Sequence, residues 1–150
     1  MRLSFLLKYS VFWRMVRIGL GIVFIYAGYD KIFHPKDFAE AVYNYQLLPD
    51  SLINITAIVL PWFELVLGLF LVSGFWQEGC AVASSALLLV FFIAMGVNMA
   101  RGLNIHCGCF SVTAESAMDI WTLVRDSFLL LISVLLTASV LRRNEGSSKK

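Results

Sequence analysis

Four long apolar runs constrain what this chain can fold into, and they lie at about residues 15–33, 55–75, 79–100 and 120–141. Each run is uniformly apolar and close to the ~20 residues that a helix needs to cross the hydrocarbon core of a bilayer. Lipid accepts only helices or closed barrels, and these runs lack the alternation of apolar and polar residues that barrel strands show. We therefore expect an all-α fold, an integral membrane four-helix bundle that forms a single transmembrane domain over residues 1–141. Because the spans take up most of the 150 residues, a separate soluble domain does not fit.

The basic residues indicate how the bundle is oriented, because lysine and arginine collect in the cytoplasmic flanks of membrane spans. They cluster before the first run and after the last, at Arg2, Lys8, Arg14, Arg17, Arg142, Arg143, Lys149 and Lys150. We therefore predict that both termini are cytoplasmic, that residues 142–150 form a basic tail, and that loops 34–54 and 101–119 face the other side. In a bacterium this describes a multi-pass protein of the inner membrane, with the lipid bilayer as its constant partner. The net charge of +2 then reflects topology, and no nucleic-acid partner is expected.

The last loop contains a pair of cysteines, Cys107 and Cys109, separated by Gly108. Cys80 begins the third run at its other end, roughly 30 Å of helix away, whereas a disulfide needs α-carbons within about 7 Å. If the loop faces the periplasm, the pair stands where disulfides persist. Glycine permits the turn that closes the pair, and a strained, exposed disulfide is labile. This pattern favours a pair that cycles between dithiol and disulfide.

Two other interpretations of the cysteine pair stay open. The pair is an inert staple or a bridge to a partner protein, although so tight a loop would constrain little of the unfolded chain. Alternatively, His106 joins the two cysteines in binding a soft metal such as Cu(I). A structural zinc site needs four ligands, and the nearby sequence offers three, so no metal is expected.

Polar and ionisable residues inside the runs form a second candidate site. A charge in the hydrocarbon costs ~2.5–3.5 kcal/mol on insertion scales, so each such residue needs a partner or a function. We expect Arg125 to pair across the bundle with Glu64 or Asp30, because the adjacent Asp126 points about 100° away around the helix. The network fixes helix register, relays protons, or forms a polar wall for a quinone headgroup beside Trp121. Its members are Asp30, Lys31, Glu64, Asn98, Arg101, Arg125 and Asp126.

Several motifs together resemble a known family. They are RIGLG at 17–21, GYDKIFHP at 28–35, LPWFEL at 60–65 and HCGCF at 106–110, followed by Trp121 and Arg125. With these motifs the sequence resembles the DoxX-like membrane proteins, and most closely their MauE-type redox-associated branch. The resemblance implies a four-helix inner-membrane protein that acts with thioredoxin-like partners in maturing disulfide-containing periplasmic enzymes. It also implies a link to quinone, because DoxX relatives are associated with quinone-linked sulfur oxidation.

The resulting hypothesis is a membrane thiol-disulfide redox protein in which Cys107 and Cys109 are the catalytic residues. They would exchange with a periplasmic thioredoxin-like protein, or with a client that has disulfides, through a mixed disulfide. Two rivals stay open: a non-enzymatic scaffold or chaperone for assembly of a periplasmic enzyme, and a small soft-metal carrier. A quinone cofactor would be held near Lys31, Glu64, Trp121 and Arg125.

Overall fold

The computed structural model describes residues 2–101 and 120–148, and the side chains of residues 11–101 and 123–142. Within these residues every element is a helix. The helices are α1 (Arg2–Phe33), α2 (Pro35–Asn44), α3 (Asp50–Ser73), α4 (Gln77–Ala100) and α5 (Ile120–Ser148). Four stretches are long and apolar enough to cross a membrane: Val11–Phe33, Asp50–Ser73, Gln77–Ala100 and Leu123–Arg142. The predicted all-α bundle with four spans is confirmed, and the chain is a multi-pass membrane protein.

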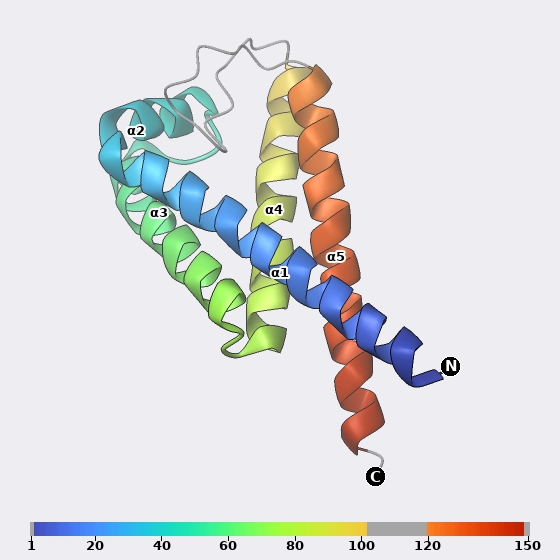
Figure 1. Cartoon of the computed structure of the whole chain (residues 1–150). Coiled ribbons are helices and arrows are strands. Elements are labelled where there is room, and N and C mark those ends of the chain that lie inside the picture. The colour runs from blue at the N-terminus through green and yellow to red at the C-terminus, as the bar shows by residue number, and fades with distance from the viewer. Residues whose placement is uncertain (1, 102–119, 149–150) are drawn as a thin grey trace.

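The four long helices form two pairs, in which α1 packs along α3 and α4 packs along α5 (Figure 1). The beginning of α1, the turn between α3 and α4, and the end of α5 lie at one end of the bundle. The short helix α2, the end of α4 and the beginning of α5 lie at the opposite end. The end of α4 and the beginning of α5, which residues 102–119 connect, therefore both lie at the α2 end of the bundle.

The glycines of α1 and α3 allow these two helices to approach backbone to backbone. A β-carbon on Gly28 would lie 2.8 Å from the carbonyl oxygen of Pro61, and one on Gly68 would lie 2.7 Å from the carbonyl oxygen of Gly21. Both distances are shorter than any real contact of this kind, so only hydrogen fits. Small residues at such crossings let membrane helices gain dispersion energy from close packing. Gly21 and Gly28 of α1 thus serve packing within the bundle.

A tight turn connects the two helix pairs at the end opposite α2. Gly74 ends α3 in a left-handed conformation with φ of 79°, and its N–H donates a hydrogen bond to the carbonyl of Phe70 at 2.9 Å. The next helix begins after Trp76, which also has positive φ, at 44°. The ring of Trp76 lies directly over Gly79, where a β-carbon would meet it at 2.7 Å. Glycine at positions 74 and 79 lets α4 begin after only three connecting residues.

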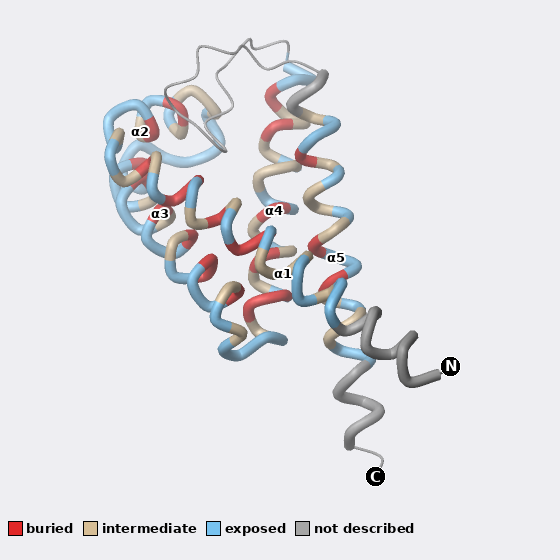
Figure 2. Tube along the Cα trace, viewed as in Figure 1, coloured by how far each residue is buried: buried red, intermediate tan, exposed pale blue. Residues whose placement is uncertain are grey.

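Burial follows the inward faces of the helices, and the outward faces are exposed and apolar (Figure 2). Outward side chains such as Ile58, Val90 and Phe128 are about 60% exposed, which suits contact with lipid tails. Cys80 is 3% exposed and belongs to the central core, so it is a small buried residue. The core cluster consists of Leu20, Phe24, Leu67, Leu71, Cys80, Leu88 and Leu136.

Helix α2 was not predicted, because the sequence analysis treated residues 34–54 as a loop. Its ten residues are too few to cross a bilayer, so the search for apolar runs passes over it. The local signals are nevertheless present. Pro35 occupies the first turn, where its missing N–H costs nothing, and Asp37 in the same turn suits the positive end of the helix dipole. Phe38 and Ala41, three residues apart, form the buried face of α2.

Candidate functional site

An ion pair between Lys31, near the end of α1, and Glu64, in the middle of α3, is enclosed in the bundle. The Nζ of Lys31 donates hydrogen bonds to both carboxylate oxygens of Glu64, at 2.7 Å to Oε1 and 2.8 Å to Oε2. The two side chains are 0% and 2% exposed. Burying either charge alone would be very costly, whereas the pair compensates both charges at once. The pair therefore joins α1 to α3 at a defined register.

Two phenyl rings complete the surroundings of the Lys31 ammonium group. Its Nζ lies 5.0 Å from the ring centroid of Phe38 on α2 and 4.9 Å from that of Phe91 on α4. Both distances are within the range of ~6 Å over which an aromatic ring attracts a cation. Helices α1, α2, α3 and α4 thus all contribute to one small charged centre, and α2 closes it at its own end of the bundle.

The local sequence explains why Lys31 reaches Glu64. Gly28 lies one turn before Lys31 on α1, and a β-carbon there would collide with the backbone of Pro61 and Leu65, on either side of Glu64 in α3. Residues three apart share a face of a helix, so the close approach at Gly28 places Lys31 on the same crossing. A larger residue at position 28 would hold the two helices apart and lengthen the ion pair.

Arg125 and Asp126 form a second ion pair, and this result contradicts a prediction. The Nε of Arg125 donates to Oδ1 of Asp126 at 3.1 Å, whereas the sequence analysis expected Arg125 to pair with Glu64 or Asp30. Both oxygens of Glu64 are bound to Lys31, and Asp30 lies 3.7 Å from the ring of His34. The error has a physical reason: an arginine side chain is long and flexible enough to fold back along its own helix to a neighbour that points elsewhere.

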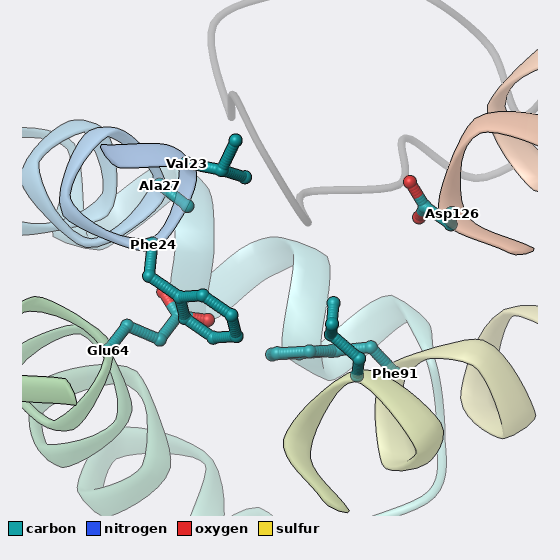
Figure 3. Close-up of a pocket in the computed structure, with 7 residues that line it drawn as sticks. Val23, Phe24, Ala27, Glu64, Phe91 and Asp126 are labelled. Carbon is teal, nitrogen blue, oxygen red and sulfur yellow. The ribbon is translucent and has the colours of Figure 1, made fainter. Parts of the chain in front are cut away.

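A small cavity lies between the α1–α3 pair and the α4–α5 pair (Figure 3). Its volume is about 20 Å³, which is room for a water molecule, since a site needs roughly 10–15 Å³ of such space to hold one. The carboxylate of Glu64 approaches it from α3 and that of Asp126 from α5, and the rest of its wall is apolar (Figure 3). The lining residues are Val23, Phe24, Ala27, Glu64, Leu88, Phe91 and Asp126.

Comparison with known proteins places this bundle in a family. A family model described as "Methylamine utilisation protein MauE" matches residues 8–139. The chain belongs to the MauE family. It is similar to the methylamine utilization protein MauE of Paracoccus denitrificans, with 36% identity over 137 residues that cover 91% of this chain and 73% of that protein. It is also similar to MauE of Methylorubrum extorquens, with 34% identity over 120 residues that cover 79% of this chain and 64% of that protein.

The predicted MauE-type resemblance is thereby confirmed, and the wider relation to DoxX-like proteins stays a prediction. This MauE-family chain spans between about two thirds and three quarters of the length of these two relatives. No solved structure matches the chain. The geometry of the ion pairs and of the cavity therefore rests on this structure and on the physical chemistry of its residues.

The predicted site residues of this MauE-family protein fall into three groups. Lys31 and Glu64 come together, as the enclosed pair described above. Arg125 lies on α5, bonded to Asp126, which faces the same cavity as Glu64. The remaining three lie beyond what the structure describes: Trp121 is in the first turn of α5 with its side chain outside the described residues, and Cys107 and Cys109 are outside them altogether.

The described residues do not test the predicted quinone site, because the side chain of Trp121 lies outside them. Lys31 has no exposed surface and donates to both oxygens of Glu64, and the cavity beside Glu64 has a volume of about 20 Å³. Quinone coupling stays a prediction that rests on the resemblance. The metal prediction also keeps its status: the described residues include no group of three metal-binding side chains, and His106, Cys107 and Cys109 lie outside them.

The sequence analysis missed a cluster of hydroxyl groups that joins α4 to α5. The Oγ atoms of Ser85 and Ser133 are 2.8 Å apart, and Oγ of Ser85 is 2.9 Å from Oγ1 of Thr137. Ser84 joins the same cluster at 3.2 Å from Ser133, and Thr137 donates to the carbonyl of Ala81 at 2.9 Å. The sequence signal for this cluster was two pairs of hydroxyl residues on successive spans, Ser84 with Ser85 and Ser133 with Thr137. They hold α4 and α5 together as a unit.

Proposed function

We propose that this MauE-family protein is a membrane component in the maturation of a periplasmic enzyme, and that its Cys107 and Cys109 exchange disulfides with a thioredoxin-like partner. The names of the relatives connect them with methylamine utilisation, so we infer that the client enzyme belongs to that process. In this proposal one thiolate of the pair attacks a disulfide of the partner, a mixed disulfide forms, and the second cysteine resolves it. Two thiols on one protein are oxidised while one disulfide on the other is reduced, so atoms and electrons balance.

The observation that carries this proposal is the position of the two ends of segment 102–119. Helix α4 ends at Ala100 and α5 begins at Ile120, and both lie at the same end of the bundle as α2, opposite the beginning of α1 (Figure 1). The basic flanks predict that this end faces the periplasm. A thiol pair on a segment of this length, tethered at both ends there, would stay at the membrane surface where a soluble periplasmic partner can reach it.

The buried ion pair supports the same proposal from within the bundle. Lys31 bonds Glu64 and contacts Phe38 of α2, so the end of the bundle that carries segment 102–119 is built on a fixed charged centre. A rigid platform favours exchange with one partner geometry, because fewer groups must be ordered when the partner binds. The bundle would then hold the thiols in place while the chemistry stays in the loop.

The test is to trap the thiols in intact membranes by mass-tagged alkylation. Wild type, Cys107→Ser and Cys109→Ser are compared, with Cys80→Ala as the matched control, because Cys80 is buried in the core of the bundle. We expect the wild-type pair to shift between reduced and oxidised forms when the membranes are treated with a thiol reductant and an oxidant. We expect one of the two single variants to accumulate a mixed disulfide with a periplasmic protein, and Cys80→Ala to behave as wild type.

The opposite outcome favours the scaffold rival. If the redox state of the pair never changes and neither variant traps a partner, the exchange proposal is wrong. Co-purification of a periplasmic enzyme with both serine variants would then indicate a scaffold that needs no thiol chemistry.

A further inference from the structure

Asp126 differs from Glu64 in how its charge is compensated, although both face the same cavity. Both oxygens of Glu64 accept hydrogen bonds from an ammonium group that has no exposed surface. Asp126 receives one described hydrogen bond, from Nε of Arg125 to its Oδ1. The side chain of Arg125 is 46% exposed, while that of Asp126 is 7% exposed. The counter-charge of Asp126 is thus about half exposed, whereas the carboxylate itself is buried.

The carboxylate of Asp126 also has an oxygen without a described partner. The carboxylate of Asp126 points away from α5 into the gap that separates it from α1 and α4 (Figure 3). Among the residues that the structure describes, Oδ2 has no hydrogen-bond partner. A polar atom in a membrane interior that lacks a protein partner takes a water molecule where there is room for one. The cavity has that room, and Glu64 supplies a second polar wall.

We propose that Asp126 is a proton-binding group, which takes up and releases a proton through water in this cavity. Uptake forms one O–H bond on the Asp126 carboxylate and removes one negative charge, and no electrons move. This proposal does not depend on the proposed thiol exchange. Ionisable residues inside membrane spans commonly mark paths of this kind.

The groups around Asp126 assign the proton to this residue. From α1 the nearest charge is Lys31, which is committed to Glu64 from α3. Helix α5 itself supplies Arg125, and α4 presents apolar Leu88 and Phe91 to the cavity. Glu64 has the full charge of Lys31 at hydrogen-bond distance from both oxygens. Asp126 has one hydrogen bond from Arg125, so its charge is only partly compensated. A carboxylate in that setting either retains a counter-ion or becomes neutral by taking a proton.

The proton would exchange with the aqueous phase at the α2 end. Asp126 lies six residues into α5, so about 9 Å of helix separates it from the beginning of that helix at 1.5 Å per residue. The cavity also lies at the seam between two helix pairs that are joined internally by glycine contacts and by hydroxyl groups. The charge of Asp126 therefore lies at the contact between the α1–α3 pair and the α4–α5 pair. A protonated, neutral Asp126 would allow the two pairs to pack more closely there.

Infrared difference spectroscopy of the full chain in lipid nanodiscs, taken between low and high pH, tests the proposal. A protonated carboxylic acid gives a carbonyl band that is lost when the acid ionises. We expect a component of this band that disappears in Asp126→Asn. Asp37→Asn is the matched control, because Asp37 is exposed on α2, and it should keep the component. Cys107→Ser should also keep it, because the site is independent of the thiols.

Carbon-13 labelling of the wild-type protein replaces the variant as the test if Asp126→Asn fails to fold. In wild type, carbon-13 at aspartate carboxyls should shift the component, and the same label at glutamate carboxyls should leave it in place. The proposal is overturned if the component survives Asp126→Asn, if it follows the glutamate label, or if the buried carboxylates give no pH-dependent band.

Discussion

Lys31 on α1 and Glu64 on α3 form an ion pair with two hydrogen bonds, and neither side chain reaches the surface of the bundle. The pair sits one turn from the glycine contact at Gly28, so charge and close packing fix the same crossing of the two helices. Phe38 of α2 touches the ammonium group at that crossing. The position of α2 at the end of the bundle therefore depends on this centre.

Removing one member of the pair should be far more harmful than removing both. Glu64→Gln leaves the Lys31 ammonium buried without a counter-charge, and such changes cost about 3–5 kcal/mol of unfolding free energy. The double variant Lys31→Met with Glu64→Gln removes both charges and should recover most of the loss. The measurement is the unfolding free energy in detergent micelles, arranged as a double-mutant cycle. A double variant that is as unstable as the sum of the two single variants would show that the charges do not compensate each other.

The glycine crossing gives a prediction with an internal control on the same helix. Gly28→Ala forces a methyl group against the backbone of Pro61 and should cost about 1–3 kcal/mol, as overpacking typically does. Gly19→Ala is the control, because nothing lies within 4 Å of a β-carbon at that position. It should leave the stability unchanged or raise it by up to about 1 kcal/mol, since alanine is the better helix former. Thermal unfolding in micelles compares the two, and an equal effect would contradict the close approach of α1 and α3.

The hydroxyl cluster between α4 and α5 should contribute a measurable share of their association. Ser133→Ala removes the hydroxyl group that lies within hydrogen-bond distance of both Ser84 and Ser85. Hydrogen bonds between membrane helices are worth about 0.6 kcal/mol on average, so we expect a loss of about 1 kcal/mol for two of them. Ser73→Ala is the control, because its exposed hydroxyl bonds only to the carbonyl of Phe70 in its own helix. If Ser73→Ala lost as much stability as Ser133→Ala, the loss would come from replacing serine in a helix and not from the hydroxyl cluster.

The sequence predicted the spans well and the pairing of charges poorly. Hydrophobic length is a local property, so each of the four spans can be located without knowing its neighbours. Ion pairing depends on which helices touch, and here the choice was made by Gly28 and Gly68, whose role as contact points appears only when the helices are packed. Lys31 took both oxygens of Glu64 because it shares a face with Gly28. Arg125 then bonded to its neighbour Asp126.

The aromatic neighbours of Lys31 and the position of Asp126 also depend on how the helices pack, so the sequence did not reveal them. Phe38 lies in a helix of ten residues, which is too short for a search based on membrane spans. Phe91 is one apolar residue among many on α4, and only the packed structure shows that its ring faces the Lys31 ammonium group. The sequence named Asp126 as a polar member of the network, but its place in the cavity follows from how the two helix pairs meet.

The orientation of the bundle is tested by labelling thiols from one side. The basic flanks predict that the α2 end faces the periplasm, so a thiol reagent that cannot cross membranes should label Cys107 or Cys109 in reduced, intact spheroplasts. Cys80 should stay unlabelled in the same cells, because it is buried near the turn between α3 and α4. Labelling that requires inside-out vesicles would reverse the predicted topology and place the thiols in the reducing cytoplasm.

Asn98 on α4 offers a final test, because its side chain is fully buried and its amide nitrogen and oxygen both lack a hydrogen-bond partner in the described structure. An unsatisfied buried polar group costs about 1–3 kcal/mol, so Asn98→Leu, which keeps the number and branching of side-chain heavy atoms, should raise the unfolding free energy by about that amount. Asn54→Leu is the control, since Asn54 is exposed on α3 and should change little. Unfolding in nanodiscs measures both variants. If Asn98→Leu instead destabilises the protein, the amide is bonded in the membrane to a group at the α2 end of the bundle.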